Sequence, residues 1–410
     1  MFKDKKPIPV LGLMLFLSAC LLSCDKPAAN NFVIPAPTPG GSSSGTGGGT
    51  ETVTLCTDIG ETPIVLAYFT EYTEVMPDPT LLTHINYAHG RFRNPSTGDG
   101  GIVVTESKKA PISSVVALKS KNPKLKVMLM IGGWGKNADG FSEMAKSGAK
   151  RTEFCQSVKS ILDKYKLDGV DIDWEYPTVS ADNETGADKA DTQNFNLVLQ
   201  ELRETLGTDR IISFASSSSG RYVDWKTAIK YIDYVNVMTY DMGAAPDGHN
   251  SPLHKSSRFT HRSWDESIEA HVSAGVPKDR QVMGIPFYGK AEKNPSEASK
   301  LFEYSVKYYE IAEILEKGTY KGKSLARAVK RQWEPTSMVP FLVDDTGKNV
   351  LSYDDPESVE AKGLYVKDKG LLGGPLSCGC PSCTERFAAE GVDLEAVRKE
   401  WEARGADFLS

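Results

Sequence analysis

The chain has 410 residues, enough for one large domain or two domains of ordinary size. Hydrophobic residues make up 40% of it, aromatic residues 9% and charged residues 25%, proportions that are typical of a globular protein with a substantial core. The formal net charge is −6 and no basic cluster is present. This balance argues against nucleic acid and anionic membrane surfaces as partners, whereas a neutral ligand is compatible with it.

The first 24 residues resemble an export signal. Three lysines precede an apolar run, residues 10–22, which is too short to remain in a bilayer as a spanning helix. Two sequences, Leu-Ser-Ala-Cys ending at Cys20 and Leu-Leu-Ser-Cys ending at Cys24, each resemble the lipid-modified site of a bacterial lipoprotein. We expect lipidation at Cys24, which polar residues follow at once, with Cys20 as the alternative. An ordinary secretory signal without a lipid is the other interpretation.

Residues 25–54 consist mainly of Pro, Gly, Ser, Thr and Asn without an apolar period, which predicts a flexible tether. Residues 55–377 form the predicted folded domain, and residues 378–410 are a divergent C-terminal segment expected to supply its last helix. Signal and tether together predict an exported lipoprotein of the bacterial cell envelope, on the periplasmic or surface side of the outer membrane. Its only membrane contact would be the lipid anchor, and we expect a monomer.

After the tether, short apolar or β-branched runs alternate with amphipathic helical patterns. Strands are predicted at residues 65–69, 84–89, 126–133, 170–176, 211–217, 234–241, 282–289 and, for the last, either 363–366 or 371–376. Helices are predicted at residues 112–120, 149–164, 192–205, 225–230, 263–274 and 308–317. Strand–helix alternation repeated about eight times favours a closed (β/α)8 TIM barrel over an open sheet. Functional residues of such barrels gather at the carboxyl ends of the strands.

The fourth predicted strand lies in Leu-Asp-Gly-Val-Asp-Ile-Asp-Trp-Glu-Tyr-Pro, residues 167–177. Acidic and apolar residues alternate here, so Asp171, Asp173 and Glu175 line up on one face, about 6–7 Å apart along the strand. Like charges this close raise one another's pKa, so at least one carboxyl is expected to hold a proton near neutral pH, as a general acid must. The alternative, a charged edge strand facing solvent, conflicts with the apolar opposite face.

Other predicted strands also end in residues suited to a binding site. They are Gly133 and Trp134 on the third strand, Met238, Tyr240 and Asp241 on the sixth, and Tyr288 on the seventh. A Tyr or Trp at a strand end is more often core packing than a ligand contact, but several strand ends agree in this chain. We expect four aromatic residues to line a cleft suited to stacking against sugar rings, namely Trp134, Trp174, Tyr240 and Tyr288.

These residues resemble glycoside hydrolase family 18, the chitinase family. The family signature Asp-x-x-Asp-x-Asp-x-Glu is complete at residues 168–175. The third-strand Gly-Gly-Trp, the sixth-strand Met-x-Tyr-Asp and the seventh-strand Pro-Phe-Tyr-Gly match in the same order, and the likeness extends over residues 64–374. The resemblance implies a TIM barrel that acts on chitin or another GlcNAc-containing oligosaccharide, without a cofactor or a metal.

The resemblance also implies a retaining, substrate-assisted mechanism. Glu175 would protonate the leaving glycosidic oxygen and later act as base towards water. The carbonyl oxygen of the substrate's 2-acetamido group would attack the anomeric carbon. Asp173 would hold the acetamido N–H, and Tyr240 would orient the acetamido oxygen. Asp171 would share a proton with Asp173.

Further residues receive roles from the resemblance. Those expected near the sugar are Asp241, Tyr288, Trp134, Tyr68, Met238 and Gly133. Among them, Tyr68 matches a first-strand Tyr that helps to buffer the charge on the inner aspartate. Asp168 is out of phase with the other acids, so we expect it to be structural, at the bottom of the barrel or in a turn.

The chain departs from the family pattern in four places. Met130 stands where the third strand usually has Ser, and the missing hydroxyl should raise the cost of ionising Asp171. Lys290 replaces an Arg and is a poorer bidentate partner. Residues 291–340 are too short for a full chitinase insertion domain, which predicts a shallower cleft and endo-type cleavage. The run directly after Gly374, residues 375–383, contains no Trp, although the family usually has one there beneath the substrate.

The leading interpretation is an endo-chitinase that cleaves β-1,4-linked N-acetylglucosamine polymers. An endo-β-N-acetylglucosaminidase acting on N-glycans shares the acidic motif, but Trp-Glu-Tyr-Pro at residues 174–177 favours the first interpretation. The third interpretation is an inactive sugar-binding relative. Glu175 argues against it, and the absent eighth-strand Trp argues for it.

The cysteines leave several interpretations open. Cys378, Cys380 and Cys383 have a spacing that can ligate zinc, but no fourth ligand follows them, so no metal is predicted. A disulfide with one remaining thiol, or a locally diverged C-terminus, are the other interpretations. Cys56 and Cys155 could pair in an oxidising compartment.

Overall fold

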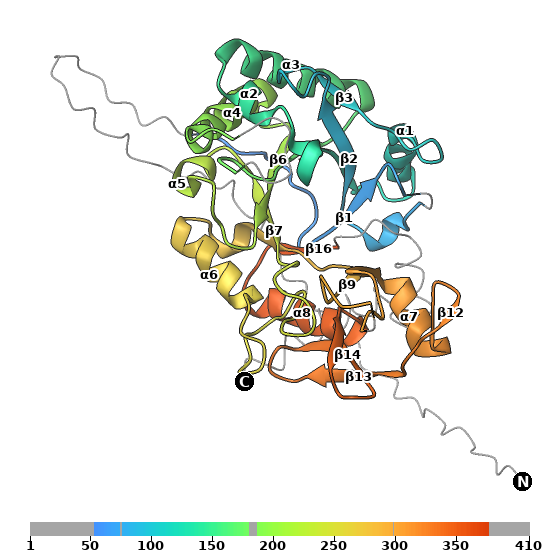
Figure 1. The fold of residues 1–410 in the computed structure, drawn as a ribbon. Coiled ribbons are helices and arrows are strands. Elements are labelled where there is room, and N and C mark those ends of the chain that lie inside the picture. The colour runs from blue at the N-terminus through green and yellow to red at the C-terminus, as the bar shows by residue number, and fades with distance from the viewer. Residues whose placement is uncertain (1–52, 74–75, 180–186, 298, 377–410) are drawn as a thin grey trace, which may run out of the picture. The chain divides into compact units, whose positions relative to one another are not determined.

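The computed structural model describes residues 53–73, 76–179, 187–297 and 299–376. These residues form a closed sheet surrounded by helices and a second, antiparallel sheet (Figure 1). The predicted signal at residues 1–24, the tether up to residue 52 and the C-terminal segment 378–410 lie outside the described residues.

Eight parallel strands make the barrel, in the order β1-β16-β8-β7-β6-β5-β4-β2, and pairing between β1 and β2 closes it. The strands are β1 (Ile64–Thr70), β2 (His84–Phe92), β4 (Lys126–Gly133), β5 (Gly169–Trp174), β6 (Ile211–Ser217), β7 (Tyr234–Met238), β8 (Gln281–Met283) and β16 (Gly373–Leu376). A short strand, β3 (Ile102–Val104), pairs antiparallel with β2. The TIM barrel predicted from strand–helix alternation is therefore confirmed.

Helices cover the outer face of the barrel (Figure 1). They are α1 (Ile112–Val116), α2 (Phe141–Ala145), α3 (Gly148–Tyr165), α4 (Asp191–Leu206), α5 (Trp225–Ala228), α6 (Trp264–Ala274) and α8 (Pro356–Asp368). Local sequence sets their ends, as α6 shows. Ser263 accepts a hydrogen bond from the Glu266 N–H and Glu266 returns one to the Ser263 N–H, while Gly275, at a φ of 115°, ends the helix.

The structure decides between the two predicted positions of the eighth strand and differs from the prediction around it. The eighth strand is β16, within the predicted range 371–376, whereas residues 363–366 belong to α8. Helix α8 itself was not predicted. The predicted strand 282–289 is divided, because β8 ends at Met283 and Tyr288 begins a strand of the second sheet.

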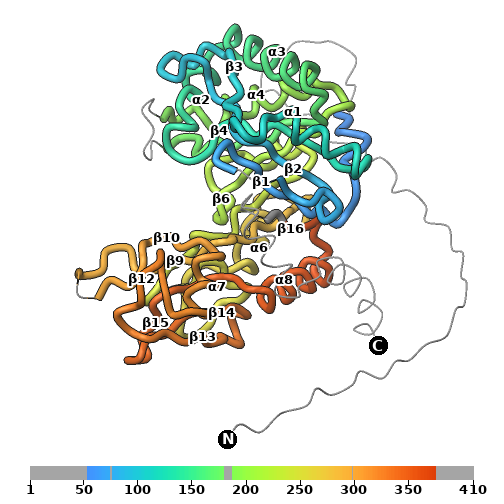
Figure 2. The backbone as a smooth tube through the Cα atoms, turned by 90° about the vertical axis from the view of Figure 1, so that its right-hand side faces the viewer, coloured from blue at the N-terminus to red at the C-terminus, as the bar shows by residue number. Residues whose placement is uncertain are grey.

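The expectation that residues 291–340 are too short for an added α+β domain was wrong. A five-stranded antiparallel sheet in the order β10-β9-β15-β14-β13 and helix α7 (Tyr308–Lys317) follow β8 (Figures 1 and 2). Its strands are β9 (Tyr288–Ala291), β10 (Ser305–Lys307), β13 (Val329–Glu334), β14 (Val339–Asp344) and β15 (Asn349–Ser352), with a small hairpin of β11 (Thr319–Tyr320) and β12 (Lys323–Ser324). The argument for a shallower cleft therefore loses its basis.

Two findings concern the membrane and the cysteines. Within the described residues, no helix is long and apolar enough to cross a membrane. Cys56 and Cys155 are both free thiols, so the suggested disulfide between them is not formed.

Candidate active site

The acid row lies on the inner face of the barrel, on strand β5 between β4 and β6. Asp171 is fully buried, Asp173 is 5% exposed, and Glu175, directly after the strand, is 8% exposed. The alternate residues Val170 and Ile172 are also buried, in the hydrophobic core. This alternation follows from the pleat of the strand, which sends successive side chains to opposite faces.

Asp171 accepts three hydrogen bonds. The Tyr68 hydroxyl donates to Oδ2 at 2.9 Å, the Ser213 hydroxyl to Oδ1 at 2.6 Å, and the Asn236 amide to Oδ1 at 3.0 Å. Burial raises the pKa of Asp171 to about 6, and the hydrogen bonds limit this rise because they stabilise the carboxylate. Asp171 is therefore mostly ionised at neutral pH.

The hydroxyl that Met130 lacks is supplied from the other neighbouring strand. Met130 is the register partner of Asp171 on β4, and Ser213 is its partner on β6. Sequence reasoning missed Ser213. The available signal was the position of Ser213 inside the otherwise apolar predicted strand 211–217, but its meaning depends on a register that the sequence alone does not provide.

Asp173 has no such support. Its Oδ1 atom is buried and has no hydrogen-bond partner among the described residues. Burial, followed by the charges of Glu175 and Asp171, raises the pKa of Asp173 well above its usual range, so this carboxyl keeps its proton to higher pH than an ordinary aspartate. The backbone around it is tight, because a Cβ atom on Gly132 would lie 2.1 Å from the Asp173 carbonyl oxygen. Glycine fits this position for two reasons: it has no Cβ atom, and it readily adopts the φ of 103° found for Gly132.

Glu175 has a pKa suited to proton transfer at neutral pH. Burial, with a contribution from the charge of Asp241, raises the pKa of Glu175 to about 7, although a hydrogen bond from Tyr176 opposes the rise. Both protonation states of Glu175 are therefore populated near pH 7, which is the condition for a group that acts as acid and then as base.

Asp241 links the barrel to the antiparallel sheet. The Tyr288 hydroxyl donates to its Oδ1 at 2.9 Å, and Lys290 Nζ lies 3.1 Å from the same oxygen. The Asn250 side chain accepts from the Asp241 N–H and donates to the Tyr288 carbonyl, which fixes both backbones. Tyr240 contacts the Tyr288 ring edge-on, with 6.2 Å between ring centroids. Lys290, the replacement for Arg, is thus used as a single point charge on Asp241.

The remaining residues expected near the sugar lie at the same end of the barrel, with one exception. Trp134 directly follows β4 and is 54% exposed, next to Gly133, whose φ is 121°. Met238, the last residue of β7, is half-buried. The expectation that Trp174 lines the cleft was wrong, because Trp174 is 2% exposed and stacks on Phe141 at 5.2 Å in the outer core.

Asp168 lies at the opposite end of the strand from Glu175. It precedes β5, accepts a hydrogen bond from the Val127 N–H at 2.6 Å, and lies 2.5 Å from Lys119 Nζ. These contacts tie β5 to β4 and to the helical segment before β4, and they make no contribution to the acid row.

The sequence matches glycosyl hydrolases family 18 over residues 64–376. This chain belongs to that family. The match contains the complete barrel, from the first residue of β1 to the last residue of β16. The acid row on β5 lies within the matched residues.

Among curated proteins, chitinase A1 of Niallia circulans is 29% identical over 384 residues, covering 77% of this chain and 55% of its own length. Chitinase-3-like protein 2 of Homo sapiens is 28% identical and covers 75% of this chain and 81% of itself. Among solved structures, the family 18 N-acetylglucosaminidase of Paenibacillus barengoltzii is 29% identical with a TM-score of 0.64, covering 77% of this chain and 96% of its own. The allosamidin complex of Ostrinia furnacalis group IV chitinase is 26% identical with a TM-score of 0.66, covering 81% and 100%.

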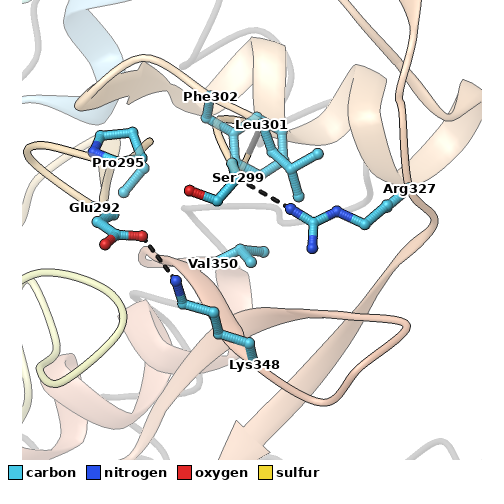
Figure 3. A pocket seen from close by; sticks show the side chains of 9 residues that line it. Glu292, Pro295, Ser299, Leu301, Phe302, Arg327, Lys348 and Val350 are labelled. Carbon is cyan, nitrogen blue, oxygen red and sulfur yellow. Dashed lines mark hydrogen bonds and ion pairs between the residues drawn. The ribbon is translucent and has the colours of Figure 1, made fainter. Parts of the chain in front are cut away.

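A separate pocket lies in the antiparallel part of the family 18 domain (Figure 3). Its two basic side chains are already engaged, since Arg327 donates to Asp344 at 2.9 Å and Lys348 to Glu292 at 2.8 Å. The pocket therefore offers no unpaired charge to a ligand. The described residues contain no group of three His, Cys, Asp or Glu side chains that could hold a metal ion, and the three C-terminal cysteines lie outside them.

Proposed function

We propose that this protein hydrolyses β-1,4-linked N-acetylglucosamine polymers, chitin or chitooligosaccharides, by a retaining, substrate-assisted mechanism. The observation that carries the proposal is the buried, unpartnered Oδ1 of Asp173 beside a carboxyl, that of Glu175, with a pKa of about 7. A buried acceptor without a donor is costly, and such an atom in a native site calls for a ligand group. The N–H of a 2-acetamido group is a donor of the required kind.

In the proposed reaction, Glu175 donates its proton to the glycosidic oxygen as the bond to the anomeric carbon breaks. The acetamido carbonyl oxygen of the same sugar attacks that carbon and forms an oxazolinium-like intermediate. Asp173 holds the acetamido N–H, and the hydroxyl of Tyr240 orients the acetamido oxygen. Glu175, now a carboxylate, removes a proton from the water that opens the intermediate, so the anomeric configuration is retained.

The proton on Asp173 has an acceptor within the acid row. In this proposal Asp173 enters the reaction protonated and Asp171 ionised, in keeping with a pKa of Asp173 that burial raises well above its usual range and a pKa of Asp171 of about 6. When substrate charge develops, transfer of this proton to Asp171 leaves a carboxylate on Asp173 beside the oxazolinium-like cation. The hydrogen bonds from Tyr68 and Ser213 keep Asp171 ionised and so ready to accept the proton.

Hydrolysis of chitooligosaccharides by the purified protein and its Glu175→Gln variant tests the proposal. We expect the wild-type protein to shorten the oligosaccharides and the variant to leave them intact. Glu269→Gln, which changes an exposed glutamate paired with Lys278 on the surface, serves as control and should be fully active. Equal hydrolysis by Glu175→Gln and wild type would refute the assignment of the acid.

The same samples separate the other functions that share this fold. We propose that cleavage is internal, and the sizes of the products test this. The α+β part of the domain means that a short insertion no longer supports the proposal. If chitooligosaccharides remain intact, release of glycans from an N-glycoprotein would identify an endo-β-N-acetylglucosaminidase. Binding of oligosaccharides without hydrolysis of either substrate would identify a sugar-binding relative.

We further propose that the protein is an exported lipoprotein anchored through Cys24. The supporting geometry is that residues 53–60 pack at the amino-terminal end of the barrel, opposite the acid row. The Cys56 N–H donates to Asp233 at 2.7 Å, and the Ile59 carbonyl lies 2.8 Å from His84 Nε2 at the start of β2. The described chain therefore enters the domain at the end of the barrel opposite the acid row. Metabolic labelling with a radioactive fatty acid should fail for Cys24→Ala and persist for Cys20→Ala.

A further inference from the structure

A cluster of charged side chains with no role in the proposed reaction lies at the carboxyl end of β2. Glu71 directly follows β1, and His89 and Arg91 are near the end of β2. The side chains of Glu71 and His89 are 8% and 11% exposed, and that of Arg91 is 27% exposed. Binding residues of such barrels lie at the carboxyl ends of the strands, so buried charged groups at this end are candidates for contact with a ligand.

The cluster borders the residues that carry the exposed tryptophan of the site. His89 Cδ2 would lie 3.4 Å from a Cβ atom placed on Gly133, so the imidazole is a direct neighbour of this glycine. Arg91 Nε donates to Asn137 Oδ1 at 2.8 Å, on the short helix that follows Trp134. Gly132, the residue before Gly133, packs against the backbone of Asp173. The cluster therefore lies on the Trp134 side of the acid row.

A β-bulge aims His89 at this position. Ala88 pairs with Met130 and Gly90 with Ile131, so His89 is the one extra residue of β2 against β4. A bulge of this kind turns a side chain away from the regular alternation, and bulges are common beside active sites. The His89 carbonyl is occupied by the Thr105 N–H at 2.9 Å, so the backbone of the bulge is held in place.

Hydrogen bonding fixes the tautomer of His89. Nδ1 contacts the Glu71 carboxylate, which can only accept, so Nδ1 carries the proton and Nε2 carries the lone pair. Although burial raises its pKa, bonds with Arg91 and His89 lower the pKa of Glu71 below its usual range, which keeps it ionised. Burial lowers the pKa of His89, which keeps the ring neutral. Arg91 Nη2 lies 3.3 Å from the same Nδ1; because a guanidinium only donates, it forms no hydrogen bond with Nδ1 in this tautomer, and the closer Glu71 carboxylate is the partner of the Nδ1 proton. The positive charge of Arg91 also opposes protonation of the ring.

The Nε2 atom of His89 is available to a ligand. No described residue forms a hydrogen bond with it, and it is not among the fully buried polar atoms that lack a partner, so it retains contact with solvent. An oriented, neutral imidazole next to Gly133, the residue before the exposed Trp134, offers an acceptor in the same part of the site as an apolar ring face. Sugar rings combine hydroxyl donors with an apolar face in the same way.

We infer that His89, held by Glu71 and Arg91, accepts a hydrogen bond through Nε2 from a hydroxyl or acetamido N–H of the saccharide unit that stacks on Trp134. This inference rests on the proposed function, because it assigns a further substrate-binding residue to the same site. Glu71 and Arg91 are positioning residues that act through the imidazole. His89 would therefore favour a saccharide that presents a hydrogen-bond donor to Nε2.

The test is calorimetric titration of chitotetraose into the full-length chain carrying Glu175→Gln, which binds without turnover. Adding His89→Phe should weaken binding about fivefold, the loss of one neutral hydrogen bond. His89→Gln should weaken it less, because its amide oxygen can accept near the position of Nε2. His254→Phe is the matched control, since His254 makes an equivalent Nδ1 contact with Asp265 at the surface, and it should bind like the parent.

Glu71→Gln separates the binding role from a structural one. The amide of Gln can donate to Nδ1, which moves the ring proton to Nε2 and turns the acceptor into a donor. Nitrogen-15 NMR of the imidazoles should show His89 protonated at Nδ1 in the parent and at Nε2 in this variant, with affinity reduced to the level of His89→Phe. Thermal unfolding of each variant identifies losses caused by misfolding.

The outcomes distinguish the two proposals. Equal affinity of His89→Phe and parent, or a ring proton found on Nε2 in the parent, would overturn the role of His89 and leave the proposed function intact. Failure of the parent to bind chitotetraose, together with absence of hydrolysis by the wild-type protein, would overturn both. Reduced affinity of His89→Phe with an unchanged control supports the inference.

Discussion

Ser213→Ala is expected to change the pH dependence of the enzyme more than its stability. The Ser213 hydroxyl is fully buried and donates to Asp171 at 2.6 Å, the shortest of the three hydrogen bonds on that carboxylate. The substitution removes one donor without adding bulk, while Tyr68 and Asn236 remain bonded to Asp171. The charged form of Asp171 therefore loses stabilisation and the protonated form does not.

The size of the effect follows from the energy of the lost bond. A hydrogen bond to a charged group contributes about 1.5–3 kcal/mol, and 1.36 kcal/mol corresponds to one pH unit, so the pKa of Asp171 should rise by about one to two units. The pKa is about 6 in the intact site. In the variant, a large part of Asp171 would be protonated at pH 7 and unable to take the proton of Asp173.

The proposed mechanism turns this rise into a change in the pH profile of kcat/KM. Activity requires Asp171 ionised and Glu175 protonated, so the acidic limb reports the first pKa, about 6, and the basic limb the second, about 7. In Ser213→Ala the acidic limb moves to higher pH and overlaps the basic limb. If the pKa of Asp171 rises to about 7.5, the maximum of the bell-shaped profile of kcat/KM against pH falls by about threefold.

Initial rates on a chromogenic chitobioside between about pH 4 and pH 9 measure both limbs. Tyr68→Phe is the matched comparison, since it also removes one hydroxyl from Asp171, at the longer distance of 2.9 Å, and should shift the acidic limb in the same direction by less. An acidic limb that stays in place in both variants would show that Asp171 does not have to be ionised, and the proton transfer proposed from Asp173 would then be wrong.

Three further predictions follow from the described contacts. The pKa of Glu175 is about 7 in the folded chain against an ordinary value of 4.5, so ionisation of this carboxyl destabilises the fold as the pH rises between these values. Glu175→Gln should therefore raise the free energy of unfolding at pH 8 by up to about 3 kcal/mol and leave it unchanged at pH 4, measured by thermal unfolding. Gly132→Ala puts a Cβ atom 2.1 Å from the Asp173 carbonyl oxygen, and the resulting displacement should lower kcat/KM at least ~100-fold in steady-state assays. Lys362→Met leaves Asp354 buried without its cation, which should cost about 3–5 kcal/mol in urea unfolding.

The acid row could be predicted from sequence because it depends only on local chain geometry. Alternation with period two places Asp171 and Asp173 on one face of whichever strand contains them, and the apolar opposite face requires that strand to be internal. The same rule was sufficient to place Val170, Ile172 and Trp174 in the outer core. Trp174 was nevertheless assigned to the cleft, because a tryptophan beside a catalytic motif suggested a sugar platform although its position in the alternation pointed outward.

What the sequence could not provide was register and the path of the chain after β8. Ser213 supports Asp171 only because β5 and β6 pair with these two residues opposite each other. Tyr288 and Lys290 reach Asp241 from a strand of the second sheet, and this sheet is assembled from short strands that the helix and strand periodicities do not reveal. Local patterns specify which face a residue occupies, whereas the partner across the sheet is set by the whole fold.

Three carboxyl groups of similar chemistry acquire different protonation states because the barrel surrounds them differently. Asp171 receives three hydrogen bonds that limit the rise of its pKa to about 6, whereas Asp173 has a buried oxygen with none and a pKa raised well above its usual range. Glu175, at the carboxyl end of the barrel, has a pKa of about 7. Burial and the number of donors thus raise the three pKa values to different extents, and these differences agree with the roles of proton acceptor, acetamido holder and acid in the proposed reaction. Substitutions that change the donors, and not only those that remove the acids, should therefore redistribute the roles.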